Sequence, residues 1–348
     1  MAYTTIDNPG LFFNTKLTTG TGSSQAVTGV GFQPDWIWGK RRDSSGNNSL
    51  FDSVRGITKG LESNGTGAEF TSTDYYSSFD SDGFTIAAGS SGAGNGSSQT
   101  AVQWCWLGAN GTASNSDGSI TSTVSANTTA GFSIVSYTGT GSNATVGHGL
   151  GVKPNWIINK TRDTTAQMWS VYHSSRGATK HLGLDRTNAE DTGSAYYQDT
   201  EPTSSVFSVG SEAATNYSSA AFIAYCFAEK KGYSKFGRYT GNGDANGTFV
   251  YTGFKPAWVM VKRTDGANSW IIMDNKRTIS NPMGEELKAE DNSAGSVATR
   301  WDQLSSGFKL RNTGAAVNGS GAAYIYMAFA ENPFVANDSG TAVPVTAR

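Results

Sequence analysis

The chain of 348 residues is poor in charged side chains, in cysteine and in long apolar runs. Charged residues form only 16% of it, against about 25% in ordinary domains. With 28 acidic and 26 basic residues, the formal net charge is −2. A protein that binds nucleic acid through its phosphates needs a basic excess, so we expect no nucleic-acid partner.

No apolar run approaches the roughly 18 residues of a membrane span, and the opening MAYTTIDNPG lacks the basic and apolar regions of a signal peptide. We therefore expect no membrane insertion and no secretory route. The two cysteines, Cys105 and Cys226, are far apart, whereas a disulfide-stabilised secreted domain carries more of them at closer spacing. Synthesis in a reducing cytoplasm is indicated.

Glycine is abundant, at 43 residues. Because glycine costs about 1 kcal/mol per helical position, a coiled coil or a long-helix protein is excluded. Apolar residues form 37% of the chain and aromatic residues 11%, which is enough for a core and excludes general disorder. A turn-rich β protein with a polar surface remains.

One motif occurs three times: a proline, a tryptophan two residues later and a lysine four residues after that. The copies are GFQPDWIWGKRRD (31–43), GVKPNWIINKTRD (151–163) and GFKPAWVMVKRTD (253–265). Downstream, FDSVRGITKGL (51–61) aligns with YHSSRGATKHL (172–182), and apolar runs follow at 101–107, 222–228 and 324–330. The sequence therefore predicts three tandem units.

Strand-like runs open each unit, and the alternation over 132–137 suits a strand with both faces engaged. Asn-Gly and Asp-Gly pairs between the runs supply tight reversals. We predict an all-β fold of three tandem β-sandwich or jelly-roll-like units. The one segment with helical composition is 281–291, where Glu285, Glu286 and Leu287 interrupt the β pattern.

The repeats set the expected boundaries. They are a first sandwich with an N-terminal arm (1–108), a polar linker (109–131), a second sandwich (132–231), a third sandwich (232–334) and an extended C-terminal tail (335–348).

Three blocks of the sequence resemble a repeat family of marine bacteriophage virion proteins that is labelled tail-fibre-like. They are GFQPDWIWGKRRD, SDGSITSTVSANTTAGFSIVSYTGTGSNATVGHGLGVKPNWII and KFGRYTGNGDANGTFVYTGFKPAWVMVKRTD. The resemblance covers residues 1–334 and implies a concanavalin-like jelly roll and a structural role in the virion. It carries no catalytic residue, ligand or metal over to this chain.

The repeated tryptophans, Trp36, Trp156 and Trp258, have two readings. Indole faces bind sugar rings, but each of these residues lies inside an apolar run, so we favour a core position. Cys105 and Cys226 occupy one column of the repeat and are read as small buried residues.

A basic cluster follows each tryptophan. It comprises Lys40, Arg42, Lys160, Arg162, Lys262 and Arg263. Such a cluster suits phosphate or an acidic glycan, but we favour solvated strand ends paired with Asp43, Asp163 and Asp265.

Arg55, Arg176 and Arg277 recur in all three units, and Asp52 and Asp274 precede two of them by three residues. We favour an internal ion pair or a carbonyl clamp within each unit.

Paired aromatic residues in expected loops are the best candidates for contact with a partner or a glycan. They are Tyr75, Tyr76, Tyr196 and Tyr197, with Trp301 as a further candidate. Loop tyrosines offer rigid, amphipathic contact area. Packing of each loop on its own unit is the alternative.

Few residues of the sequence are candidates for catalysis. His148, His173 and His181 do not recur between units, and no HExxH, GxSxG or phosphate-loop pattern occurs. A carboxylate pair such as Asp80 and Asp82 suits a glycosidase, but acids in a loop are usually turn residues. We predict no enzyme, no catalytic residue, no cofactor and no metal.

These observations predict a structural protein on the exterior of a bacteriophage virion, made in the bacterial host cytoplasm and associated with a tail or fibre. Its expected partners are other virion proteins and a host surface glycan or receptor. Capsid decoration is the alternative, since no collagen-like tract or heptad stalk occurs, and a glycan depolymerase is the less favoured third reading. Three units in one chain also predict a built-in pseudo-trimer.

Overall fold

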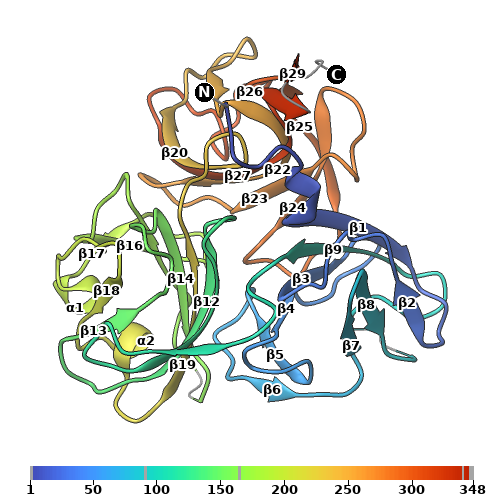
Figure 1. Ribbon diagram of the computed structural model, residues 1–348. Coiled ribbons are helices and arrows are strands. Elements are labelled where there is room, and N and C mark those ends of the chain that lie inside the picture. Colours follow the sequence, from blue (N-terminus) through green and yellow to red (C-terminus); the bar gives the residue numbers. More distant parts are fainter. Residues whose placement is uncertain (1–2, 90–91, 164–165, 339–340, 345–348) are drawn as a thin grey trace.

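The computed structural model describes residues 3–89, 92–163, 166–338 and 341–344. Strands dominate these ranges, accompanied by two four-residue helices and one short 3-10 turn. The predicted all-β fold class is confirmed. Figure 1 shows three lobes around a common centre, which we call the first (residues 9–108), second (109–231) and third (232–333) lobes.

The elements of the first lobe are η1 (Pro9–Leu11), β1 (Phe13–Thr19), β2 (Gln25–Val27), β3 (Trp36–Arg41), β4 (Ser49–Asp52), β5 (Lys59–Glu62), β6 (Phe70–Thr71), β7 (Tyr76–Asp80), β8 (Gly83–Ile86) and β9 (Thr100–Trp106). Those of the second are β10 (Ala113–Asn115), β11 (Ser122–Asn127), β12 (Phe132–Thr138), β13 (Ala144–Gly147), β14 (Trp156–Thr161), β15 (Ser170–His173), β16 (Lys180–Gly183), β17 (Asp191–Thr192), α1 (Ser194–Tyr197), β18 (Val206–Val209), α2 (Ala213–Asn216) and β19 (Ala221–Phe227).

The third lobe holds β20 (Ser234–Thr240), β21 (Phe249–Tyr251), β22 (Phe254–Arg263), β23 (Ile271–Asp274), β24 (Met283–Lys288), β25 (Ser296–Leu304), β26 (Gly307–Leu310) and β27 (Ala323–Pro333). A hairpin of β28 (Val335–Asp338) and β29 (Thr341–Pro344) follows it.

One strand order recurs in the large sheets of the three lobes. It is β1-β9-β3-β4-β5-β6 in the first, β12-β19-β14-β15-β16-β17 in the second and β20-β27-β22-β23-β24-β25 in the third. In each order the last strand of the lobe thus lies between the strand that opens the order and the strand that bears the tryptophan of the Pro-x-Trp motif. Smaller groups of strands cover one face: β2-β8-β7, β13-β18 and β26-β21.

Each large sheet is apolar on both faces. Successive side chains along a strand point to opposite faces, so neighbouring residues enter different cores. In β3, Ile37 faces the core inside the first lobe, whereas Trp36 and Trp38 face a central core that all three lobes share. Trp156 and Trp258 belong to the same central core and are fully buried. The core reading of the repeated tryptophans is therefore confirmed, and this core lies between the lobes.

Aromatic rings hold the lobes together across each of their junctions. Trp36 stacks on Tyr225 of the second lobe with ring centroids 4.3 Å apart. Trp106 of the first lobe meets Trp258 of the third edge-on at 5.9 Å, and Trp156 of the second meets Trp270 of the third at 6.0 Å. Buried aromatic pairs contribute about 0.5–1.5 kcal/mol beyond their burial.

Cys105 and Cys226 are free and buried, as predicted. Both face the core inside their own lobe, in the column that Ala328 fills in the third. Burial raises the pKa of both thiols, so they are protonated at neutral pH.

The prediction of a polar linker over 109–131 is wrong. β10 and β11 pair with each other, and β11 pairs with β12, so this segment adds two strands to the large sheet of the second lobe. Val124 and Ser125 are buried within it. A segment rich in Ser and Thr fits a strand once a neighbouring strand supplies its hydrogen bonds.

The prediction of helical structure over 281–291 is also wrong. β24 occupies this segment, and Leu287 pairs with Ile272 of β23. Both Met283 and Leu287 are buried. Strand pairing and burial outweigh the weak helical propensity of two glutamates and a lysine.

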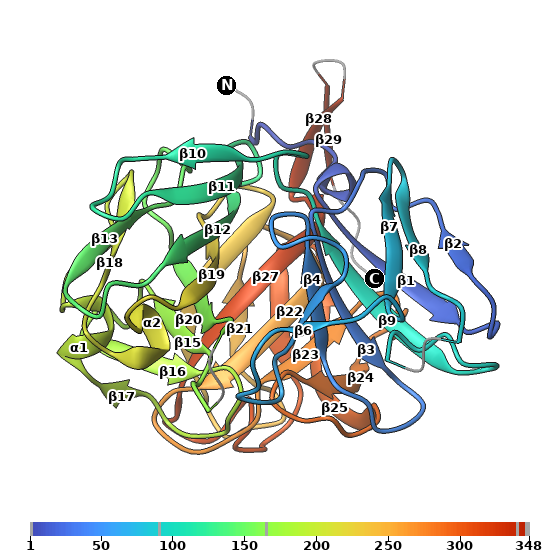
Figure 2. The ribbon, with the colours of Figure 1, turned by 90° about the horizontal axis from the view of Figure 1, so that it is seen from below.

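The tail expected to be extended over 335–348 forms the β28–β29 hairpin, and residues 339–340 and 345–348 of it lie outside the described residues. Figure 2 shows the hairpin and the N-terminal segment at one end of the molecule, with β16, β17 and β25 at the opposite end. Tyr3 and Phe334 are in contact at the hairpin end, with ring centroids 6.2 Å apart.

The shared core predicts that one central indole stabilises the whole molecule. We expect Trp36→Ala to lower the free energy of unfolding by about 3–5 kcal/mol, measured by urea denaturation. The control is Tyr217→Ala, at a ring 49% exposed, which should change it by less than about 0.5 kcal/mol. Equal effects of the two substitutions would contradict the shared core.

Candidate functional site

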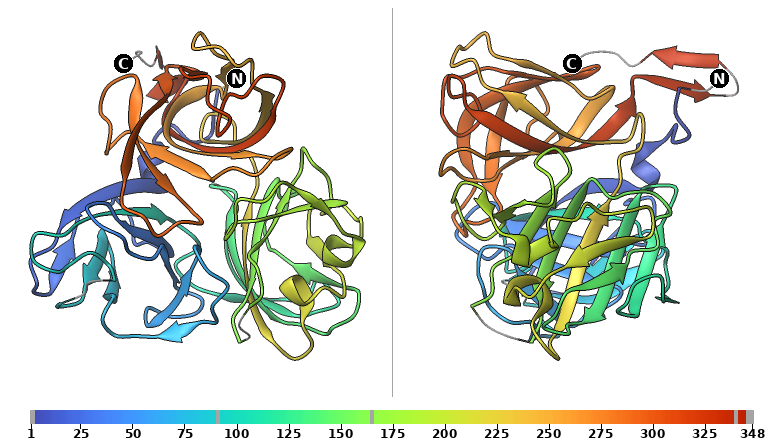
Figure 3. Two further views of the ribbon diagram at one scale, coloured as in Figure 1. Left: turned by 180° about the vertical axis from the view of Figure 1, so that it is seen from behind. Right: turned by 90° about the vertical axis from the view of Figure 1, so that its left-hand side faces the viewer.

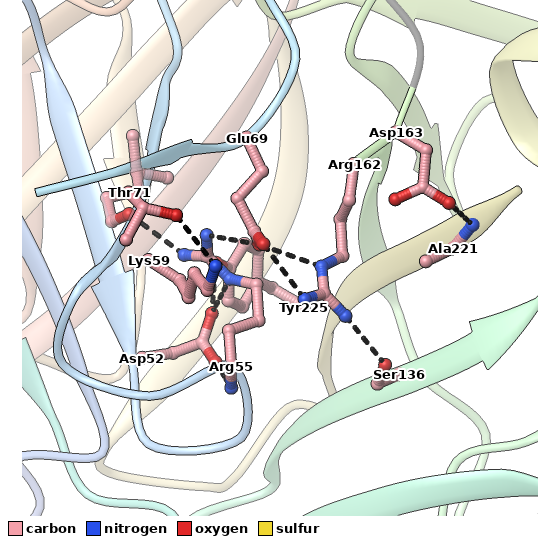
Figure 4. A network of polar contacts seen from close by, with 11 residues as sticks. Asp52, Arg55, Lys59, Glu69, Thr71, Ser136, Arg162, Asp163, Ala221 and Tyr225 are labelled. Carbon is pink, nitrogen blue, oxygen red and sulfur yellow. Dashed lines mark hydrogen bonds and ion pairs between the residues drawn. The ribbon is translucent and has the colours of Figure 1, made fainter.

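A buried polar network joins the first and second lobes (Figure 4). Asp52 and Arg55 are buried, and the Arg55 Nε donates to Asp52 Oδ2 at 2.5 Å. Tyr225 of the second lobe donates its hydroxyl to the same oxygen at 2.8 Å. Arg55 Nη2 also donates to the Leu50 carbonyl at 2.8 Å. The predicted ion pair and carbonyl clamp are both present.

Burial alone would lower the pKa of Arg55, but the adjacent Asp52 carboxylate and Tyr225 raise it above its ordinary value. The guanidinium is therefore permanently charged, and the carboxylate beside it is its counter-ion. Removing one partner of such a buried ion pair strongly destabilises the protein, because the other charge is left buried and unpaired. The network thus makes the junction depend on Tyr225, a residue of the neighbouring lobe.

Glu69 extends the network towards solvent and lies between two arginines. It accepts from Arg162 of the second lobe at 2.7 Å and 3.0 Å, and from Arg55 at 3.3 Å. Burial would raise the pKa of Glu69, but the hydrogen bonds and charges of the two arginines lower it. Arg162, expected at a solvated strand end, instead bridges the lobes.

The junction between the third and first lobes repeats this arrangement. Arg277 Nε donates to Asp274 Oδ2 at 2.6 Å, and its Nη2 donates to the Ile272 carbonyl at 3.0 Å. The donor from the neighbouring lobe is here the indole Nε1 of Trp104, 3.0 Å from Asp274 Oδ2. Trp104 occupies the position in β9 that Tyr225 occupies in β19.

At the junction between the second and third lobes a histidine replaces the aspartate. His173 holds the position of Asp52, and the corresponding residue of the third lobe is Met327, which has no hydrogen to donate. Burial lowers the pKa of His173 to about 3, so the ring is neutral at pH 7. Arg176 pairs with Glu190 instead. At this strand position, an aspartate thus stands where the facing position of the neighbouring lobe holds a donor, and a histidine where it holds methionine.

The repeated lysines are buried, so their expected position at solvated strand ends is wrong. Lys40, Lys160 and Lys262 are each no more than 1% exposed. Lys160 Nζ donates to the Thr66 carbonyl of the first lobe at 3.1 Å, and Lys262 Nζ to the Thr187 carbonyl of the second at 2.9 Å. Burial lowers the pKa of all three to about 8.

The aspartates expected to pair with these clusters do so in part. Arg263 pairs with Asp265 at 2.7 Å, and Arg41, rather than Arg42, pairs with Asp43 at 3.3 Å. Asp163 accepts the Ala221 backbone N–H at 2.6 Å (Figure 4).

One further contact, which the sequence did not indicate, recurs at all three junctions. Three side chains donate to backbone carbonyls of a neighbouring lobe from equivalent positions, each just before a strand (β4, β15 or β23): Asn48, Trp169 and Trp270. The acceptors are Lys288 at 3.2 Å, Glu62 at 2.9 Å and Gly183 at 2.9 Å, respectively. The first lobe donates to the third, the second lobe to the first and the third lobe to the second, so the contacts close a ring.

Three of the five predicted contact residues cannot reach a partner. Tyr76, Tyr197 and Trp301 are buried, so these predictions are wrong. Tyr76 packs between Phe51 and Phe84 because the strand β7 turns its side chain inward. The alternative, packing on the residue's own unit, holds for these side chains.

The ring of Tyr197 packs against Tyr172, and its hydroxyl bonds Ser170. Trp301 packs on Phe308. Tyr75 and Tyr196 are half-buried and keep part of their surface in solvent. Tyr75 contacts Phe70 at 5.3 Å, and Tyr196 stacks on His181 at 3.5 Å.

In the described ranges, His, Cys, Asp and Glu side chains form no group of three that could hold a metal ion. Neither of the two short helices in those ranges could cross a membrane. Asp80 accepts from the Thr85 hydroxyl across the β7–β8 turn, whereas Asp82 accepts from the backbone N–H groups of Gly29 and Gly31 in the loop after β2.

A sequence family described as a domain of unknown function (DUF7483) matches residues 8–333. The chain belongs to this family. The match begins at Asn8, just before η1, and ends with β27, so the family domain comprises all three lobes together. No curated protein and no solved structure matches the chain.

The junction predicts a measurable role for one hydroxyl. We expect Tyr225→Phe to lower the free energy of unfolding by about 1–3 kcal/mol, because Asp52 loses a donor inside the protein. Tyr217→Phe, at an exposed ring, should be neutral in the same urea denaturation series. If Tyr225→Phe is also neutral, the hydroxyl does not support the junction.

The lowered pKa of Glu69 predicts a pH dependence. The unfolded chain binds a proton near the ordinary value of 4.5 and the folded chain only at lower pH, so the contribution is present above pH 4.5 and is lost below it. We expect Glu69→Gln to destabilise the protein at pH 7 and the difference to shrink at acidic pH. Asp74→Asn, at an exposed carboxylate, is the control; a pH-independent difference would contradict the assignment.

Proposed function

We propose that this protein is a structural component on the exterior of a bacteriophage particle, tail- or fibre-associated, where it contacts the host surface or neighbouring virion proteins. The observation that carries the proposal is the closed ring of three lobes. One chain presents three similar lobes about one axis, which suits a threefold position in an assembly. The resemblance of the repeat blocks to marine phage virion proteins supports the same role.

The two ends of the molecule differ in structure, which supports a different binding role for each end. The N-terminal segment and the β28–β29 hairpin lie at one end (Figures 2 and 3). Tyr3 ties the N-terminal segment to the third lobe, since its hydroxyl donates to the Gly253 carbonyl at 2.5 Å. We assign this end to neighbouring virion proteins and the opposite end, with β16, β17 and β25, to outward contact.

The polar surface favours display rather than burial in a large interface. Charge is low and glycine, serine, threonine and asparagine fill the turns, while the cores inside and between the lobes are closed. Loops on rigid sheets are common carriers of recognition. A rigid ring with outward loops fits a component that touches another surface repeatedly.

The test is to locate the protein in the particle. A peptide tag on the C-terminus, gold-labelled on intact virions and imaged by electron microscopy, should appear at the tail tip or on fibres. Label spread over the head would make the protein a capsid decoration protein and overturn the tail assignment. Virions without the tag are the control, and tagged particles that carry no label would overturn the virion role.

A further inference from the structure

A polar groove lies beside β16 and β17 of the second lobe, at the end opposite the hairpin. Its volume is about 210 Å³, and its lining includes Met168, His181, Gly183, Arg186, Asn188 and Asp191. Binding pockets for drug-sized molecules measure about 300–1,000 Å³, so this groove accommodates a single small ring.

One wall of the groove is aromatic. His181 is 8% exposed and stacks on Tyr196, with ring centroids 3.5 Å apart and planes 16° apart. Met168 fixes the tyrosine from the side, since its sulfur accepts from the Tyr196 hydroxyl at 3.5 Å. Burial lowers the pKa of His181, so the ring is neutral at pH 7 and offers an apolar surface with polar edges.

The rim of the groove is polar and does not favour an anion. The Arg186 guanidinium is paired with Asp185 at 2.9 Å, and Glu190 is paired with Arg176. Asp191 is exposed, and its Oδ1 accepts the backbone N–H of Thr192 at 2.7 Å. Amide, guanidinium and carboxylate groups such as those of Asn188, Arg186 and Asp191 bind hydroxyls through paired donors and acceptors.

The corresponding place in the third lobe is narrower. A cavity of about 70 Å³ lies there, lined by Leu287, Lys288 and Ser296 among others. Lys288 stands where the second lobe has Gly183, because both residues end the equivalent strand. The residue equivalent to His181 is Glu286, which is paired with Arg300 at 2.6 Å.

In the first lobe the place is filled by a side chain. Gly60 replaces His181, and the ring of Phe70 lies against it; a Cβ on Gly60 would come within 2.2 Å of that ring. Phe70 in turn contacts Tyr75 at 5.3 Å. The same fold thus carries three different residue sets at this position, and the set of the second lobe leaves a ring-sized space.

We propose that the groove beside β16 and β17 binds one neutral, hydroxyl-rich ring of a saccharide. The aromatic wall of His181 covers the C–H face of the ring, and Asn188, Arg186 and Asp191 bind its hydroxyls. Gly183 leaves room for the Arg186 side chain at the rim, since a Cβ there would come within 2.6 Å of it. This inference rests on the proposed function, in that the groove lies at the end assigned to outward contact.

The test is ligand-observed NMR of the isolated full chain with D-glucose, D-galactose and N-acetyl-D-glucosamine, and with D-glucuronate as the anionic comparison. We expect saturation transfer to at least one neutral sugar and weaker transfer to the anion. Gly183→Lys, which introduces the residue of the third lobe, and the double variant Asn188→Ala/Asp191→Ser should weaken binding at least about tenfold.

Asp74→Ser, at an exposed carboxylate in the first lobe, is the matched control and should bind as the unaltered protein does. Thermal unfolding of every variant checks the fold, and the double variant changes only exposed residues. Absence of transfer to all neutral sugars, or equal binding by the groove variants and the control, would overturn the site.

The two proposals fail separately. A protein that is labelled on virions but binds no sugar overturns the saccharide site and leaves the virion role standing. A protein that binds sugar through the groove but is missing from virions overturns the virion role alone.

Discussion

Each large sheet of this protein has two apolar faces, and only one of them can be covered from inside its own lobe. The smaller strands cover the face that carries Ile37 and Cys105, and the face that carries Trp36 and Trp38 needs cover from elsewhere. Burial of a large apolar side chain contributes about 1.5–3 kcal/mol, so an exposed face of tryptophans would be strongly unfavourable. The other two lobes supply the cover, and the central core follows from this constraint.

Polar groups buried beside the central core make the order of the lobes specific. Asp52 meets Tyr225 and Asp274 meets Trp104, whereas at the remaining junction neutral His173 stands in the place of the aspartate and Met327 in the place of the donor. A carboxylate facing Met327 would lose the donor that the neighbouring lobe supplies, and a buried acceptor without a partner costs about 1–3 kcal/mol. The lobes share one fold but are not interchangeable, because each junction matches its own pair of side chains.

Burial within apolar runs and pairing between residues close together in the chain could be predicted from the sequence. The buried cysteines, the core tryptophans and the Asp52–Arg55 pair follow from apolar runs and from spacing of three residues. The errors concern residues whose partners lie elsewhere in the chain. Lys160 is buried because a carbonyl of another lobe accepts from it, and the groove at His181 exists because side chains differ between equivalent positions. No local pattern carries that information.

The dependence of all three lobes on one core is tested most directly by differential scanning calorimetry of the intact chain. A shared core predicts a single transition in which the calorimetric enthalpy equals the van't Hoff enthalpy, although a chain of 348 residues ordinarily unfolds in parts. Two or three separate transitions, each with the enthalpy of one lobe, would show that the lobes fold independently and would contradict the shared core.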